Sequence, residues 1–190
     1  AGAFTDFTRR TLLQSSIDIE AFVRDDIAKK IALELDRTAI YGTGSSNQPL
    51  GLKDTSGIGS QSLTSFGSFA EYIAMETDVA VANAEGNAMK YLINASARGA
   101  LKSTEKTSTS TANFVFENNQ INGYDAIVSN QLANNDAIFG DFSQFIVGMW
   151  SGLDLTVDPF AGATAGTVRI IALQDIDYAV RQAGAFCFAT

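Results

Sequence analysis

Residues 16–41 restrict the fold of this chain most strongly, because apolar side chains recur there at helical spacing over a long stretch. These positions are Ile19, Phe22, Val23, Ile27, Ile31 and Leu35. Such spacing predicts a helix with one apolar stripe, which has to be buried against another element. At ~1.5 Å per residue the helix would be roughly 36 Å long. Ser15, Ser16 and Asp18 offer N-cap oxygens at its start, and Gly42 provides a stop.

A glycine-rich connector, GTGSSNQPLGL, begins at Gly42 and follows this helix. A phosphate-binding glycine loop has to follow a strand and open a helix, so that backbone amides and the helix N-terminus face the anion. This connector follows a helix, contains no lysine and matches neither of the two common glycine motifs. We therefore interpret it as a turn built on Gly42, Pro49 and Gly51. Leu50 and Leu52 are expected to anchor it by packing.

The rest of the chain mixes helices and strands. A second helix is predicted from Ser68 to about Ala84, then a buried strand at residues 89–93 and a short helix over 95–102 that Asn94 can cap. Residues 53–67 and 103–112 are polar connectors. From residue 113 onward, β-type runs dominate: NFVFE, YDAIVS, IFGDFSQFIVGMW, LDLTVD, VRIIAL, DYAVR and AFCFA. Because short helices enter among strands without strict alternation, the pattern favours the α+β class.

The opening residues 1–13 would form a strand on which neither face is cleanly apolar. Phe4 shares one face with Asp6, Thr8 and Arg10, whereas Phe7 shares the other with Thr5, Arg9 and Thr11. A strand that sits on a core normally alternates apolar and polar residues. We therefore expect an exposed arm or loop strand here.

Composition excludes several classes of function. The 190 residues include no histidine, which removes the usual base of Ser-His-Asp and Cys-His catalysis and the commonest zinc ligand. The single cysteine, Cys187, lies between two phenylalanines and is expected in the core. The net charge of −8 argues against a protein that grips nucleic-acid phosphates. No apolar run approaches the ~20 residues of a membrane-spanning helix.

Paired carboxylates are the remaining candidates for chemistry: Asp25 with Asp26, Asp154 with Asp158, and Asp175 with Asp177. The first pair diverges by about 100° around the predicted helix. The second pair would be about 13 Å apart on an extended strand. The third is closer, and a role in cation binding or acid/base chemistry stays open for it beside solvated edge charges. Met149 and Trp150 indicate core or interface. No catalytic residue, cofactor site or metal site is predicted, and we expect the chain not to be an enzyme.

The segment LLQSSIDIEAFVRDDIAKKIALELDRTAIYGTGSSNQPLGL strongly resembles the tailed-bacteriophage major capsid family, the Hong Kong 97-type shell proteins. In that family a long "spine" helix follows a serine-acid turn and ends in a G-x-G…QP-x-G connector. Four later segments are similar to the family in the same order: MKYLINASARGALKST, INGYDAIVSNQL, AIFGDFSQFIVGMWSGLDLTVDPF and VRIIALQDIDYAVRQAGAFCFAT. Asp125 stands where the family usually has proline. The resemblance covers nearly the whole chain.

The resemblance implies a Hong Kong 97-type fold with a peripheral and an axial domain. By analogy, residues 12–66 and 165–190 form the peripheral domain and residues 67–164 the axial domain. Residues 1–11 look like the returning strand of the family's extended loop. The outgoing strand and the N-terminal arm would precede residue 1, so the resemblance implies an N-terminally truncated chain.

The implied function is that of a major capsid protein, which self-assembles through pentamers and hexamers into an icosahedral shell around double-stranded DNA. Expected partners are other copies, scaffolding, portal and protease proteins, and DNA bound without sequence specificity, with no membrane and no cofactor. The expected location is the virion, after assembly in the bacterial host cytoplasm. An encapsulin-like nanocompartment shell is the alternative with the same fold, and an unrelated enzyme is the third.

Some members of the family crosslink their subunits through a lysine, an asparagine and a glutamate. By our alignment the asparagine falls near Thr167 and the glutamate near Gln174. Residues 159–170 contain no asparagine. The resemblance therefore implies that this chain does not crosslink autocatalytically.

Overall fold

The computed structural model describes residues 1–8, 10, 19–107 and 113–190. The expected N-cap residues Ser15, Ser16 and Asp18, and part of the polar segment 103–112, lie outside these ranges. The described elements, in chain order, are β1 (Gly2–Thr8), α2 (Ile19–Tyr41), β2 (Gly59–Gln61), α3 (Phe69–Val81), β3 (Met89–Ile93), α4 (Ala95–Leu101), β4 (Phe116–Glu117), β5 (Gln120–Ile121), β6 (Tyr124–Val128), β7 (Ala137–Asp141), η1 (Phe142–Gln144), β8 (Phe145–Met149), β9 (Asp154–Gly162), η2 (Ala163–Ala165), β10 (Thr167–Leu173), β11 (Ile176–Val180), η3 (Ala183–Ala185) and β12 (Phe186–Ala189).

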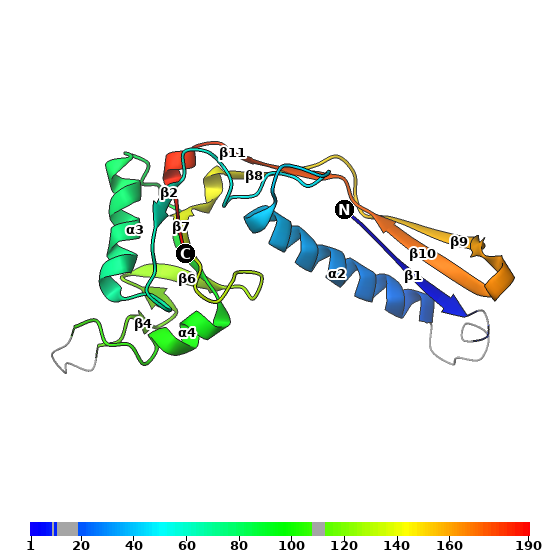
Figure 1. Ribbon diagram of the computed structural model, residues 1–190, viewed down its shortest axis with the longest axis horizontal. Coiled ribbons are helices and arrows are strands. Elements are labelled where there is room, and N and C mark those ends of the chain that lie inside the picture. Colours follow the sequence, from blue (N-terminus) through cyan, green and yellow to red (C-terminus); the bar gives the residue numbers. More distant parts are fainter. Residues whose placement is uncertain (9, 11–18, 108–112) are drawn as a thin grey trace.

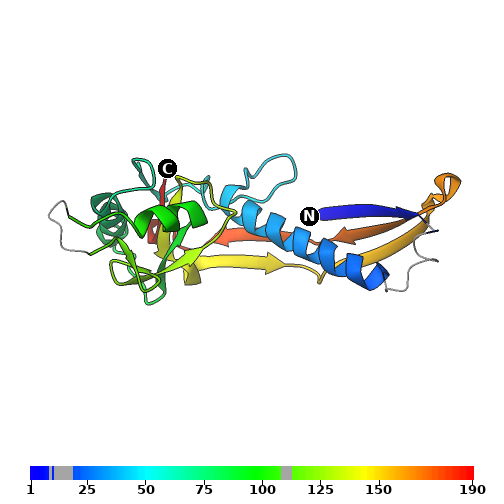
Figure 2. The same cartoon turned by 90° about the horizontal axis from the view of Figure 1, so that it is seen from below.

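The molecule is elongated (Figures 1 and 2). One end is a body built on a sheet of order β2-β12-β7-β3-β6-β5-β4, and the other end is a sheet of order β1-β10-β9 with α2 alongside it. The two-stranded ribbon of β8 and β11 runs between the two ends (Figure 1). We call these three parts the body, the α2 sheet and the ribbon.

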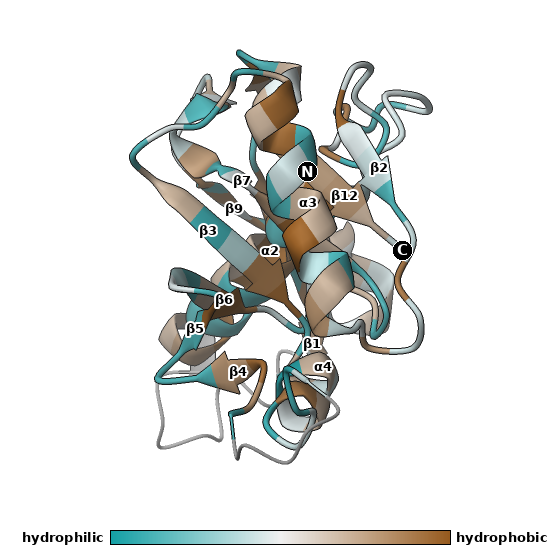
Figure 3. Ribbon diagram, turned by 90° about the vertical axis from the view of Figure 1, so that its left-hand side faces the viewer, coloured by the Kyte–Doolittle hydropathy of each residue, from teal (hydrophilic) through white to brown (hydrophobic). Residues whose placement is uncertain are grey.

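The body holds the larger core. Helix α3 packs against β2, β7 and β12 (Figure 3), and its Tyr72, Met75 and Val79 are buried. Every residue of β7 and β12 is buried, as expected for strands covered on both faces. Aromatic rings fill the centre: Tyr91 and Phe139 have ring centroids 4.5 Å apart. The C-terminal end of α2 also contributes to this core, through Ile40 and Tyr41.

A second, smaller core lies between α2 and the α2 sheet. Val23, Ile27 and Ile31 pack there with Ile170 and Ala172 of β10. The predicted helix and its apolar stripe are therefore confirmed for these positions. Phe22 does not belong to the stripe: its side chain is 68% exposed. Residues four apart drift by about 40° around a helix, whereas Phe22 lies about 100° from Val23, on another face.

Strand β1 was expected to be an exposed arm, and that prediction is wrong for one of its faces. Ala3 and Phe7 are partly buried against the smaller core. On the opposite face, the Arg169 guanidinium donates two hydrogen bonds to the Asp6 carboxylate, at 2.7 and 2.8 Å. The antiparallel pairing with β10 determines which face of β1 points toward α2. Ala3 and Phe7 lie on that face and pack against the smaller core.

The local structure around α3, β3 and α4 agrees in large part with the sequence analysis. Ser68 and Glu71 form a capping box at the start of α3, which ends at Val81 rather than near Ala84. Strand β3 has the predicted bounds. The side chain of Asn94 accepts a hydrogen bond from the Ser96 N–H at 2.8 Å and caps α4. Within the described residues, no helix has the length and apolarity needed to cross a membrane.

Strand pairing crosses the predicted domain limits. β2 and β12, which fall in the ranges 12–66 and 165–190, pair in parallel, and β12 also pairs with β7 of the range 67–164. Both strands are thus part of the body sheet. The division into two domains stays a prediction, and strand pairing alone would assign β2 and β12 to the body.

Candidate interaction surfaces

The connector GTGSSNQPLGL caps the C-terminal end of α2 with its own backbone. The carbonyl of Thr38 accepts from the Gly42 N–H at 2.8 Å, and that of Ala39 from the Leu52 N–H at 2.8 Å. The carbonyl of Ile40 accepts from the Lys53 N–H at 2.9 Å. A helix end leaves such carbonyls without intrahelical partners, so the connector satisfies them. These amides are aimed at the helix and not at an anion.

Two glycines allow the connector to approach the helix this closely. A Cβ on Gly42 would lie 2.2 Å from the Pro49 carbonyl oxygen, and one on Gly51 would lie 2.4 Å from the Gly42 nitrogen. Gly42 directly follows the last helical residue, Tyr41, as predicted. Its role is close packing, because its φ is not in the left-handed region, unlike that of Gly44 at 64°.

The two predicted packing anchors behave differently. Leu52 is buried in the larger core, as expected. Leu50 is 40% exposed and lies over Gly44 instead. The local bridge between Thr43 and Leu50 turns this side chain out of the core. The connector is therefore anchored at one position rather than two.

Three of the candidate carboxylates make local contacts. Asp25 forms an exposed ion pair with Lys29 at 2.6 Å. Asp158 accepts from the N–H groups of Phe160 and Ala161, which shapes a turn. Asp177 accepts from the N–H of Tyr178 at 2.9 Å. Among the described residues, no group of three or more His, Cys, Asp or Glu side chains could hold a metal ion.

Cys187 is a core residue, as predicted. It is fully buried in β12, and its Sγ lies 3.7 Å from a carboxylate oxygen of Asp78. Burial, together with the negative charge and the hydrogen bond of Asp78, raises the pKa of the thiol to about 12. The thiol therefore stays protonated near neutral pH and lacks the reactive thiolate form.

Tyrosine hydroxyls tie α2 to the rest of the molecule. The Tyr41 hydroxyl donates to the Asp136 carboxylate at 2.6 Å and accepts from the Ala133 N–H at 2.9 Å. Burial raises the pKa of Tyr41, so the hydroxyl remains a donor. The Tyr178 hydroxyl of the ribbon donates to the Leu35 carbonyl at 2.8 Å. These bonds fix the C-terminal half of α2 against both the body and the ribbon.

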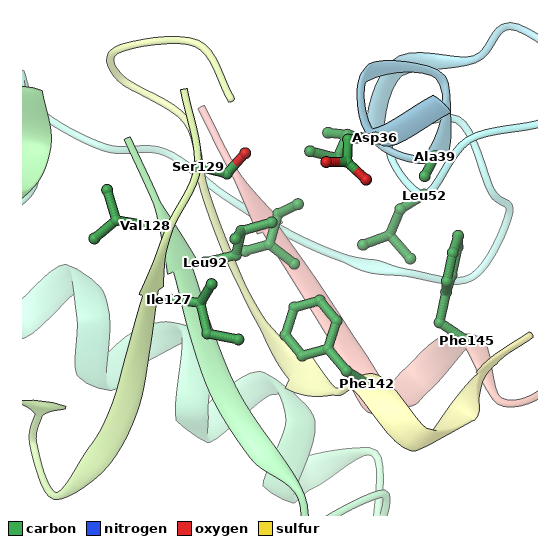
Figure 4. Close-up of a pocket in the computed structure, with 11 residues that line it drawn as sticks. Asp36, Ala39, Leu52, Leu92, Ile127, Val128, Ser129, Phe142 and Phe145 are labelled. Carbon is green, nitrogen blue, oxygen red and sulfur yellow. The ribbon is translucent and has the colours of Figure 1, made fainter. Parts of the chain in front are cut away.

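A pocket of about 370 Å³ lies between the end of α2 and the body sheet (Figure 4). Leu92, Ile127 and Phe142 contribute to its apolar wall, and Asp36 and Ser129 are the only lining residues with polar side chains. One carboxylate beside one hydroxyl provides neither a paired acid and base nor a nucleophile with its base. The wall of the pocket is otherwise apolar.

Large apolar side chains are exposed over much of the surface. The most exposed are Phe160 at 83%, Val81 at 76%, Trp150 at 73%, Phe22 at 68% and Met149 at 67%. Met149 and Trp150 were predicted to be core or interface residues, and their exposure excludes the core. Contiguous exposed apolar surface marks contacts with other molecules. The sequence analysis missed Phe160, which lies in β9, because nothing in its local pattern separates an exposed strand phenylalanine from a core one.

The two positions implied in crosslinking lie near opposite ends of β10. Gln174 is buried, and its side-chain amide donates to the Ser151 carbonyl at 2.7 Å. The Thr167 hydroxyl donates to the Gly162 carbonyl at 3.4 Å. Each has a structural partner within the chain, and neither brings a carboxylate to the site.

These features define a class: an α+β structural subunit with the Hong Kong 97-type capsid fold, as predicted. Solved structures share this fold over the whole chain. The capsid of a native GTA particle matches with a TM-score of 0.77 at 20% identity, covering 71% of that chain. The Microbacterium phage Oxtober96 structure matches with 0.79 at 14% identity over 71% of that chain. A virus-like particle from Pyrococcus furiosus matches with 0.66 at 16% identity over 76% of that chain.

The chain belongs to the phage capsid family, whose model matches residues 1–190. It is 36% identical over 182 residues to the major capsid protein of Halomonas phage phiHAP-1. That match covers 96% of this chain and 30% of the relative. The chain thus spans about a third of the length of this curated relative.

Proposed function

We propose that this chain is the shell-forming part of a phage major capsid protein, which assembles through pentamers and hexamers into an icosahedral shell around double-stranded DNA. The observation that carries the proposal is the whole-length match to the phage capsid family, together with the capsid fold over the entire chain. The 36% identity to a phage major capsid protein supports it.

The geometry fits this function. A shell subunit needs broad, partly apolar contact surfaces rather than a convergent polar pocket. The elongated shape and the exposed apolar side chains on all three parts of the molecule provide such surfaces. The net charge of −8 suits a subunit that encloses DNA without gripping it.

The same proposal includes the partners and the location of the protein. Its partners would be further copies of itself, with scaffolding, portal and protease proteins during assembly in the host cytoplasm. It would reside in the virion and carry out no catalysis. The body would contain the domain that packs around the five- and six-fold axes, and the α2 sheet would lie in the peripheral domain.

We expect no covalent crosslinking between subunits. Residues 159–170 contain no asparagine, and the position expected to carry a glutamate is Gln174, which cannot act as a carboxylate base. Mature particles, boiled in detergent and run on a denaturing gel, are expected to show this protein at monomer mass. A ladder of covalent multimers that survives reducing agent would contradict the prediction.

Electron microscopy of the full gene product that carries this chain tests the proposed function. Expression in bacteria is expected to yield closed icosahedral particles, and particles from infected cells are expected to contain DNA. Particles that enclose a protein cargo and no DNA would favour an encapsulin-like shell instead. A homogeneous monomer at all concentrations would overturn both readings.

A further inference from the structure

Strand β8 leaves one edge of the ribbon without a backbone partner. The Trp150 N–H donates to the Asp175 carbonyl at 3.2 Å, and the Arg181 N–H donates to the Gln144 carbonyl at 2.8 Å. Antiparallel pairing alternates along a strand, so the even-numbered residues of β8 bond to β11. The N–H and C=O groups of Val147 and Met149 therefore face outward. Within the described residues they have no hydrogen-bond partner.

Three side chains of β8 and that of the adjoining Trp150 are exposed as well, whereas Phe145 packs against the larger core. Ile146 and Val147 are each about half exposed, and Met149 and Trp150 are more exposed still. The segment FSQFIVGMWSGL, residues 142–153, contains no charged residue and no proline. Natural edge strands are usually protected by lysine, proline, inward charges or bulges. By this criterion β8 lacks the protection of a strand that stays uncovered.

The ribbon is also weakly supported by itself. An isolated pair of strands is marginally stable in water, and a third strand or further packing is needed to stabilise it. Tyr178 of β11 is covered by α2 through its bonds to Leu35 and Thr38. Among the described strands, none covers the outer edge of β8. An added strand at this edge would supply backbone hydrogen bonds and bury the apolar row.

The charges around the ribbon favour a second copy of this chain as the occupant. The exposed carboxylates of Asp175 and Asp177 border the ribbon, and neither forms an ion pair with a described residue. On the body, α4 exposes Arg98, and the exposed Lys102 directly follows the helix; both also lack an ion pair with a described residue. One chain thus carries exposed acidic side chains at the Trp150 end of the ribbon, with Arg181 exposed at the other end, and exposed basic side chains at α4. Unlike faces that meet head to tail generate rings when the rotation closes.

We propose that the outer edge of β8, with Trp150 beside it, is a contact between neighbouring copies, in which a second copy adds an extended segment to the ribbon. The acidic rim of the ribbon meets cationic surface of that copy. This inference rests on the proposed shell function and names one of its contact surfaces.

Hydrogen exchange tests the contact at β8 without also testing whether the protein forms a shell. The amides of Val147 and Met149 are compared between assembled particles and dissociated subunits of the full gene product. We expect exchange to slow at least about tenfold in particles, because added backbone bonds protect edge amides. Particles in which both amides exchange as fast as in free subunits would overturn the contact and leave the shell function standing. Protection that appears only with another protein bound would overturn the second copy as occupant.

A matched pair of variants tests strand addition directly. Val147→Pro removes an outward N–H and none of the bonds to β11, because edge positions of this kind tolerate proline. Val147→Thr keeps the N–H and the side-chain shape. We expect Val147→Pro to fold, with unchanged circular dichroism, but to fail to form particles, whereas Val147→Thr assembles. A folded Val147→Pro variant that assembles as well as the parent would refute strand addition at β8.

Discussion

Replacing Phe139 by alanine is expected to lower the free energy of unfolding by about 3–5 kcal/mol, the usual cost of deleting a buried aromatic ring. Phe139 lies in the centre of β7 and is 1% exposed. Its ring centroid is 4.5 Å from that of Tyr91 and 5.1 Å from that of Tyr124. Because β7 is buried on both faces, no neighbouring side chain can close the cavity without moving a strand. Chemical denaturation of the chain, followed by circular dichroism, measures the effect.

Phe160 offers a matched control. It undergoes the same substitution on the surface, where the side chain is 83% exposed. Phe160→Ala is expected to change the free energy of unfolding by no more than about 0.5 kcal/mol. If both variants lower the free energy of unfolding by the same amount, the aromatic cluster of the body is not the main core of this molecule.

The second large effect is expected at the connector. Gly51→Ala should cost about 3 kcal/mol, the upper part of the usual range for overpacking. The added Cβ would lie 2.4 Å from the Gly42 nitrogen and 2.8 Å from the carbonyl oxygens of Thr38 and Ile40. All three atoms belong to backbone, so no side chain can rotate away. The connector has to shift, and the bonds that cap α2 are lost with it.

Gly99 provides the control for this prediction. It lies inside α4, and a Cβ built there would meet no atom within 4 Å. Gly99→Ala is expected to be neutral or to stabilise the chain by up to about 1 kcal/mol, since alanine favours a helix more than glycine does. A thermal melt compares the two variants with the parent. If Gly51→Ala has the same melting temperature as the parent, the close packing of the connector against the end of α2 does not contribute to stability as predicted.

Much of the local structure could be predicted because its causes are local. The capping of α4 by Asn94 and the bounds of β3 follow from side chains a few residues apart. The wrong predictions concern residues whose burial depends on segments far away in the sequence. The burial of Phe7 depends on pairing with β10, more than 150 residues later in the chain, and the exposure of Phe22 depends on which face of α2 meets the sheet.

The candidate surfaces show the same division. The sequence excluded histidine-based catalysis, interpreted the connector as a turn rather than a phosphate loop, and assigned Met149 and Trp150 to core or interface. It could not tell core from interface for an apolar pair, because both environments favour the same side chains. The exposure of Trp150 and the unpaired edge of β8 became visible only with the strands in place.

By itself, then, the sequence determined the α+β class, the long helix that ends before Gly42, and the family. These features depend on periodicity, helix caps and the order of motifs, which can be read from residues close together in the chain. The tertiary structure alone decided that the chain has two cores, that β2 and β12 complete the body sheet, and that the connector glycines serve close packing. The reason is physical. Burial and strand partnership are properties of pairs of segments, and many pairings are compatible with one linear pattern until three-dimensional packing selects among them.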